Sequence, residues 1–150
     1  MPPKYNLHKL IGRILAIDYG QKRTGLAVSD PDQIIATSLT TIRSMDVIQF
    51  LKDYSSGEKV VLFLVGEPKQ MNYEASESSK FIEPFVRLLV KTFPNIPVRR
   101  VDERFTSKIA LQTIREAGLK KKDRQNKALI DTISATIMLQ SYLEHNSPGF

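Results

Sequence analysis

A chain of 150 residues of which 41% are hydrophobic has the length of one ordinary domain, and it contains no cysteine. Disulfides, thiolate metal sites and a cysteine nucleophile are therefore excluded. The two histidines, His8 and His145, lie in polar terminal stretches where a catalytic base is not expected. Any chemistry must then depend on carboxylates. The net charge of +6 favours an anionic partner such as nucleic acid, although many soluble proteins are mildly basic.

We expect one domain over residues 1–150, with a core at about residues 12–143 and short tails, because no repeat, low-complexity segment or long linker interrupts the sequence. No apolar stretch has the length of a membrane span, and the first residues show no secretory pattern. We therefore expect a cytoplasmic protein without a membrane partner, as a monomer or a weak homodimer. The sequence also lacks a GxxxxGK[ST] loop, which excludes a P-loop phosphate site.

Three strands are predicted at the start of the chain. Residues 13–19 and 24–29 have the composition of strands, and a turn around Gly20 and Lys22 joins them. Residues 34–42 supply a third strand, rich in threonine and isoleucine. These three segments predict an antiparallel beginning to a sheet.

Helices and strands are then predicted to alternate. A short helix is expected over residues 45–54, and the continuous apolar run over residues 60–65 is typical of a strand buried on both faces in parallel pairing. Apolar residues recur at helical spacing over residues 74–93. Pro84 favours a true helix start near Glu83, because proline is most easily accommodated in the first turn.

The last third predicts one more strand and two more helices. The strand covers residues 97–101, a helix capped by Thr106 or Ser107 runs to Ala117, and the final helix covers about residues 123–143. The order β-β-β-α-β-α-β-α-α predicts an α/β fold. In it, three antiparallel strands continue by right-handed β-α-β crossovers into one mixed five-stranded sheet flanked by helices.

Acidic residues stand at the ends of several predicted strands. Asp18 ends an apolar strand just before the turn at Gly20, and Glu67 ends the apolar strand that begins at Val60. Asp102 and Glu103 follow the strand over residues 97–101, and strand alternation lets only one of them face Asp18. Because open α/β folds bind ligands outside the carboxyl ends of their strands, these positions are candidate site residues.

Asp131 differs from these residues because it lies inside the most apolar predicted helix. Small residues share its helix face, together with Arg124 and Lys127 one to two turns before it. Small neighbours allow close approach to a sheet. The alternative is an exposed aspartate that pairs with one of those two cations or caps a local group.

Three carboxylates that meet in one place require protons or a divalent cation. At a separation of about 5 Å, each pair would repel by roughly 3 kcal/mol at an effective dielectric constant near 20. Ligands that are all oxygen atoms select Mg²⁺ or Mn²⁺. Two such ions about 4 Å apart can activate water and stabilise the leaving oxygen in phosphodiester hydrolysis without histidine or cysteine.

Four separated motifs occur in an order that is typical of one family. They are ILAIDYGQKRTGLAVSD with Asp18, VGEPKQM with Gly66 and Pro68, VDERFTSKIA, and RQNKALIDTISATIMLQ with Asp131. Over roughly residues 12–143 the chain closely resembles the YqgF/RuvX family. The resemblance implies a ribonuclease H-like fold related to Holliday-junction resolvases. It also implies a nuclease that matures the 5′ end of precursor 16S ribosomal RNA.

By position, the resemblance implies that Asp18, Glu103 and Asp131 are the catalytic carboxylates that hold the metal ions. In this assignment Asp18 bridges both ions, and Glu103 and Asp131 complete one ion each. The loop after Gly66 departs from the family pattern, because much of the family has an apolar residue where this chain has Glu67. Since related resolvases have an acidic ligand at the end of this strand, Glu67 is either a fourth ligand or a solvated loop charge.

Positive charge gathers next to each predicted ligand. The basic residues are Lys22, Arg23, Arg104, Lys120, Lys121, Lys122, Arg124 and Lys127. We expect them to contact phosphates beside the scissile bond without reading base sequence. The alternative is a solvated basic surface. Tyr19 and Tyr73 are candidates for stacking on an unpaired base, although aromatic residues near a strand end more often pack in the core.

Three other functions remain open. The first is a Holliday-junction resolvase acting on branched DNA. The second is a catalytically silent RNA-binding assembly factor, which would keep the basic surface and need no ions. The third follows from DYGQKRTG, which also resembles the first phosphate loop of the actin, hexokinase and Hsp70 group and so implies nucleotide binding. Those proteins clamp ATP between two such domains, whereas 150 residues supply only one.

Overall fold

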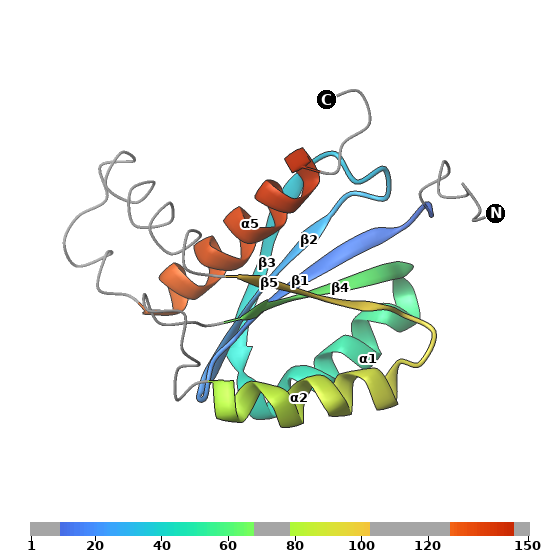
Figure 1. Ribbon diagram of the computed structural model, residues 1–150. Helices are drawn as coiled ribbons and strands as arrows, with labels where there is room; N and C mark the ends of the chain where they lie inside the picture. The colour runs from blue at the N-terminus through green and yellow to red at the C-terminus, as the bar shows by residue number, and fades with distance from the viewer. Residues whose placement is uncertain (1–9, 68–78, 103–126, 146–150) are drawn as a thin grey trace, which may run out of the picture.

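The computed structural model describes residues 10–67, 79–102 and 127–145, which form a sheet with helices on both faces (Figure 1). The strands are β1 Arg13–Tyr19, β2 Arg23–Ser29, β3 Ala36–Arg43, β4 Val60–Glu67 and β5 Val98–Asp102. The helices are the 3-10 turn η2 Ser44–Asp46, α1 Val47–Gly57, α2 Ser79–Thr92 and α5 Lys127–His145. Within the ranges described, no helix combines the length and the apolar character needed to cross a membrane.

The five strands form one mixed sheet in the order β3-β2-β1-β4-β5. The first three pair antiparallel, β4 lies parallel to β1, and β5 lies parallel to β4. The predicted mixed sheet is therefore confirmed. Because β1, β4 and β5 run in the same direction, their carboxyl ends lie at one edge of the sheet.

Each face of the sheet carries its own hydrophobic core. Leu15 and Ile17 of β1 pack into the core under α1 and α2, whereas Ile14 and Ala16 pack into the core under α5. Successive strand residues point to opposite faces, so this alternation assigns every position of β1 to one face or the other. Figure 1 shows α1 and α2 on one side of the sheet and α5 on the other.

Strand β3 begins later than the sequence indicated, because Ile34 and Ile35 belong to the preceding loop. The carboxylate of Asp30 accepts hydrogen bonds of 2.7 Å from the backbone amides of both residues. Amides bound in this turn cannot join the ladder, so the strand starts at Ala36. Burial alone would raise the pKa of Asp30, but these amides outweigh it and lower the pKa.

Pro84 lies inside α2, so the predicted helix start near Glu83 was wrong. The described helix begins at Ser79. Proline deprives the carbonyl four residues earlier, that of Lys80, of its helical amide partner. Lys80 and Pro84 are both exposed, and water can satisfy that carbonyl. The helix that was predicted to run to Ala117 lies outside the described residues.

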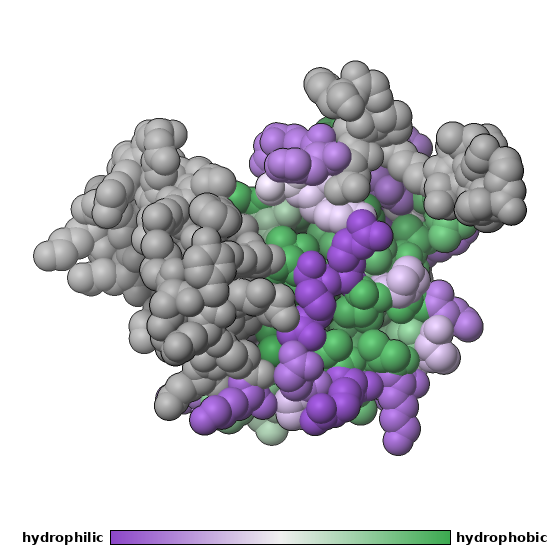
Figure 2. Space-filling model, in the orientation of Figure 1, coloured by the Kyte–Doolittle hydropathy of each residue, from purple (hydrophilic) through white to green (hydrophobic). Residues whose placement is uncertain are grey.

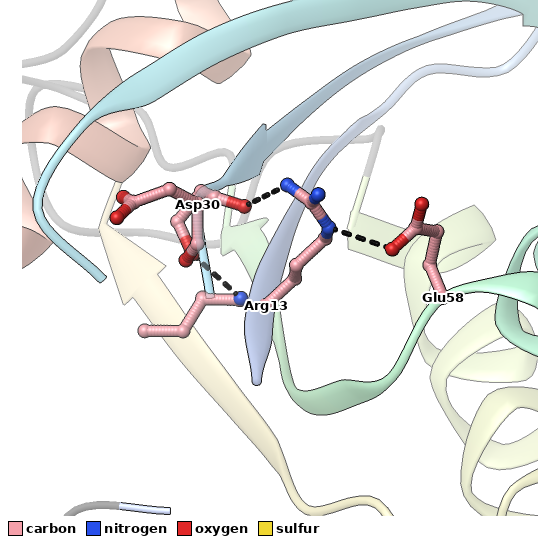
Figure 3. Close-up of polar contacts among 5 residues, drawn as sticks. Arg13, Asp30 and Glu58 are labelled. Atoms are coloured by element: carbon pink, nitrogen blue, oxygen red, sulfur yellow. Dashed lines mark hydrogen bonds and ion pairs between the residues drawn. The ribbon is translucent and has the colours of Figure 1, made fainter. Parts of the chain in front are cut away.

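At the end of the sheet away from Asp18, Arg13 ties three elements together (Figure 3). Its guanidinium donates hydrogen bonds to the Ser29 carbonyl at 3.0 Å and to the Glu58 carboxylate at 3.1 Å. The Ser29 hydroxyl accepts a hydrogen bond of 2.9 Å from the backbone amide of Ile14. These contacts join the start of β1 to the end of β2 and to the segment after α1, so this charged group has a structural explanation.

The outer strand β5 is held from both faces by arginines. Arg99 donates to the Tyr142 hydroxyl of α5 at 3.1 Å, and its guanidinium lies 5.6 Å from the centre of that ring. Arg100 donates to Glu83 of α2 at 2.8 Å, which lowers the pKa of Glu83. Figure 2 shows a band of hydrophilic side chains crossing the apolar surface on this side of the molecule. Charged side chains on an edge strand also discourage pairing with another sheet.

Candidate functional site

Asp18 is half-buried at the carboxyl end of β1, one residue before the strand ends. Ile14 and Ala16 are four and two residues before Asp18, on the same face of the strand, and they pack against α5. Asp18 therefore lies on the α5 face, at the edge where β4 and β5 also end. A carboxylate in this place is partly withdrawn from water and still accessible from the edge of the sheet.

Tyr19 lies on the opposite face from Asp18. Its ring stacks on Phe85 of α2, with ring centres 4.1 Å apart and planes inclined by 14°. Burial raises the pKa of Tyr19. The structure therefore shows the core packing that the sequence favoured for Tyr19 over stacking on a base. Tyr73 lies outside the described residues.

Two rows of residues cross the sheet beneath α5. They are the edge row Asp18, Gly25 and Thr41, and the inner row Ala16, Ala27 and Ser38. Neighbouring strands lie about 4.8 Å apart, so Asp18 and Thr41 are separated by roughly 10 Å along the edge row. The small residues between them leave room for a helix to approach closely.

Helix α5 docks on these two rows in a defined direction. The hydroxyl of Thr132 is hydrogen-bonded to Thr41 of the edge row, and that of Thr136 to Ser38 of the inner row at 2.8 Å. Ala135 is fully buried in the core that contains the inner row's two alanines. The first turns of α5 therefore lie over the edge row, and the helix runs inward from it.

This docking places the backbone of Asp131 in the helical turn above the edge row, directly before Thr132. On α5, Ala135 and Met138 follow Asp131 at helical spacings of four and seven, and both are buried against the sheet. The side chain of Asp131 lies outside the described residues. The structure thus brings the backbone of this position to the end of the sheet that carries Asp18.

The neighbouring strand ends lie at the same edge. Glu67 of β4 is paired with Asp102 of β5, the last residue of that strand. Val101 packs into the core under α5, whereas Val65 packs into the core under α1 and α2. The side chains of Glu67 and Asp102 and the whole of Glu103 lie outside the described residues.

The turn between β1 and β2 contains Lys22, and Arg23 is the first residue of β2. Gly20 is required there, because a Cβ at this position would meet the Arg23 carbonyl oxygen at 2.4 Å. Lys22 is exposed. Of the other predicted basic residues, Arg104, Lys120, Lys121, Lys122 and Arg124 lie outside the described residues, as does the side chain of Lys127.

A buried serine that the sequence analysis did not identify holds this turn. The backbone amide of Ser44 donates to the Lys22 carbonyl at 2.9 Å, and its hydroxyl donates to the Gly20 carbonyl at 2.5 Å. The same hydroxyl lies 2.8 Å from that of Thr24, which is fully buried. No local pattern in the sequence marks Ser44, because its three partners lie 20 to 24 residues away.

Replacing Ser44 with alanine should destabilise the protein by about 1–3 kcal/mol, because the Gly20 carbonyl and the Thr24 hydroxyl lose a buried partner. Urea unfolding measures the change. Ser56→Ala is the matched control, since this exposed serine donates its hydroxyl to the Asp53 carbonyl within its own helix, and we expect a change below about 0.5 kcal/mol. Equal losses in the two variants would contradict the role assigned to Ser44.

Among the side chains that the structure describes, no three acidic or histidine groups gather closely enough to hold a metal ion. The predicted set depends on Glu103 and Asp131, whose side chains lie outside that part of the molecule. What the described residues provide is an edge with one half-buried carboxylate, Asp18, and the backbone of a second acidic position above it.

A mixed sheet with three antiparallel strands, two parallel additions and a C-terminal helix packed across β1, β2 and β3 defines an α/β fold of the ribonuclease H-like class. A solved structure, RuvC from T. thermophilus in complex with a Holliday junction substrate, is similar with a TM-score of 0.56. The two chains are 16% identical, and the match covers 91% of this chain and 97% of that chain.

The model of the family described as "RuvX: Holliday junction resolvase" matches residues 12–145, so the chain belongs to the RuvX family. A relative from Flavobacterium psychrophilum is 63% identical over 131 residues, which cover 87% of this chain and 96% of the relative. Relatives from Bacteroides thetaiotaomicron and Porphyromonas gingivalis are 61% and 56% identical, over 89% and 90% of this chain and 97% and 98% of their own lengths. All three are named "Putative pre-16S rRNA nuclease".

Proposed function

We propose that this protein is a metal-dependent nuclease that hydrolyses a phosphodiester bond at the 5′ end of precursor 16S ribosomal RNA. The observation that carries the proposal is the docking of α5, which places position 131 over the edge row that contains Asp18. The names of three relatives that match nearly the whole chain support the substrate. Such a substrate implies a cytoplasmic protein, and the proposed active form is a monomer or a weak homodimer.

The proposed metal ligands are Asp18, Glu103 and Asp131. Carboxylate oxygens are hard donors, and a half-buried carboxylate at a sheet edge, as at Asp18, suits Mg²⁺ or Mn²⁺. Val101 packs toward α5, and strand alternation, together with the family resemblance, favours Glu103, the residue that follows β5, over Asp102 as the third ligand. Val65 packs on the opposite face, so the same argument does not favour Glu67, and we leave it out of the set.

Bound ions would activate the attacking water and stabilise the charge on the leaving oxygen. The chain's own residues supply the remaining functions. Asp18 would orient the ions from the sheet, and Lys22, exposed on the turn that Ser44 holds, would contact a phosphate beside the scissile bond. Arg23 and the predicted basic residues from Arg104 to Lys127 would extend this contact along the RNA backbone.

The test is cleavage of a structured 16S precursor RNA during a titration with Mn²⁺, for wild type and for Asp131→Asn. We expect wild type to cleave the RNA only with the metal, and the variant to bind RNA without cleaving it. Glu144→Gln is the matched control, because Glu144 is exposed near the other end of the same helix, and it should cleave like wild type. Wild type that binds RNA but never cleaves it would identify a silent assembly factor instead.

Cleavage of branched DNA is the second candidate function, because the matched family is described as a Holliday junction resolvase. The same edge and the same ligands would serve that reaction. A four-way DNA junction added to the titration separates the two substrates. Faster metal-dependent cleavage of the junction than of the RNA would favour the resolvase, and ATP binding without any cleavage would favour the nucleotide-binding alternative.

A further inference from the structure

The two strand hydroxyls that meet α5 are three residues apart, an odd spacing. In a regular strand Ser38 and Thr41 would point to opposite faces. The pairing of β2 with β3 shifts between Leu26 and Ala27, so that Ala27 is opposite Ser38 while Leu26 is opposite Thr40. The extra residue is Leu39. This bulge returns both hydroxyls to the α5 face.

The bulge also matches the spacing of the strand to that of the helix. Measured along β2, Ser38 and Thr41 stand opposite Ala27 and Gly25, two strand residues apart, or about 6.7 Å. Thr132 and Thr136 are four helical residues apart, a rise of about 6 Å. The two strand hydroxyls can therefore meet the two helix hydroxyls at the same time.

The direction of the hydrogen bond between Ser38 and Thr136 follows from the donors that are available. The hydroxyl of Thr136 donates its single proton to the carbonyl of Thr132 within the helix, at 2.8 Å. The hydrogen bond of 2.8 Å between Ser38 and Thr136 must then be donated by Ser38. The strand hydroxyl therefore points into the helix as a donor, which makes the contact directional.

We propose that the hydroxyl pairs Thr41–Thr132 and Ser38–Thr136 are the register lock of α5, that is, positioning residues that hold Asp131 over the edge row. Ala135 and the inner-row alanines meet through methyl groups, and apolar contacts of this kind have no preferred direction. A slip of one helical turn would keep apolar surface buried but retain at most one hydroxyl pair. The link to Asp131 rests on the proposed metal site.

Removing the Thr41–Thr132 hydroxyl pair should weaken metal binding without changing a ligand. We expect Thr41→Val and Thr132→Val each to lower the affinity for Mn²⁺ about tenfold, as loss of an outer contact typically does. The double variant should lose less than the sum of the two single losses, since both substitutions remove the same pair. Thr41→Ser keeps the hydroxyl and should restore the affinity. Thr37→Val, on an exposed residue of the same strand, is the matched control.

Electron paramagnetic resonance of Mn²⁺ gives the affinities, and circular dichroism checks that the variants fold. If Thr41→Val binds Mn²⁺ with wild-type affinity while Asp131→Asn loses binding, the register lock is overturned and the proposed metal site still stands. If wild type binds no Mn²⁺, or Asp131→Asn binds it equally well, the proposed metal site is wrong and the inference falls with it.

A second measurement does not depend on the metal. Because the chain has no cysteine, spin labels attached through Lys52→Cys on α1 and Gln140→Cys on α5 report one distance, and both positions are exposed. We expect a narrow distance distribution in the labelled parent. Adding Ser38→Ala and Thr41→Val should broaden it or shift it by about one helical turn, 5.4 Å. An unchanged distribution would overturn the lock.

Discussion

Replacing Asp18 with asparagine should remove both cleavage and the stabilisation that Mn²⁺ gives to the wild-type protein. Bound ions supply several kcal/mol of transition-state stabilisation, and each 1.36 kcal/mol is tenfold in rate, so we expect kcat to fall by at least about a thousandfold. Binding that occurs only in the folded state stabilises it by about 2.7 kcal/mol at a metal concentration of 100 Kd. Thermal unfolding with and without Mn²⁺ measures this stabilisation by the metal.

The paired readout separates a ligand from a residue that only supports the fold. A structural aspartate would lower the stability with and without the ion alike, whereas loss of a ligand removes the difference between the two conditions. Asp53→Asn is the control, because Asp53 is exposed on α1 and accepts a hydrogen bond of 3.0 Å from Gln49. It should keep both cleavage and the shift with Mn²⁺. A metal shift of wild-type size in Asp18→Asn would exclude Asp18 as a ligand.

Substitutions at two adjacent residues of β2 should rank in opposite orders by loss of stability and by loss of activity. Leu26 is fully buried under α1 and α2, while Ala27 is fully buried under α5. Leu26→Ala leaves a cavity on the opposite face of the sheet from α5 and should cost about 2–5 kcal/mol. Ala27→Leu overfills the contact with α5 and should cost about 1–3 kcal/mol. The less destabilised variant should be the less active one.

The reason is that a displacement of about 1 Å in a catalytic group can cost about a hundredfold in rate. We therefore expect kcat of Ala27→Leu to fall by about that factor, and kcat of Leu26→Ala to stay within about twofold of wild type. Denaturant unfolding gives the stabilities, and cleavage is measured at a temperature where both variants are folded. Equal activity losses would show that the two faces of the sheet are not functionally distinct.

Most of the sheet could be predicted from local pattern. The bounds of β1 were predicted correctly, and β2 and β5 differ from the predictions by about one residue, because apolar alternation and turn residues are local signals. Helix α1 ends three residues later than predicted and β4 ends two residues later. Two other errors arise from single interactions. The Asp30 carboxylate accepts hydrogen bonds from the amides of Ile34 and Ile35, which delays the start of β3. Pro84 can lie within α2 because water satisfies the carbonyl that the proline leaves without an amide partner. Neither effect depends on hydrophobic periodicity.

The sequence predicted some features of the candidate site, and long-range contacts decided the others. The sequence indicated that Asp18 ends a strand, and strand alternation now assigns it to the face of α5. It did not settle whether Tyr19 was free to stack on a base, because its partner Phe85 lies 66 residues away along the chain. Ser44 gave no signal at all, since a single serine acquires its role only from the turn that packs against it.

By itself, the sequence determined the inventory of chemistry: no cysteine, carboxylates at strand ends, positive charge beside them, and motifs in the order of the RuvX family. Only the tertiary structure decided the register of α5 on the sheet. That register depends on hydroxyl pairs whose members are 91 and 98 residues apart, and on a bulge in β3. Such contacts form only when helix and sheet pack together, so no local pattern encodes them.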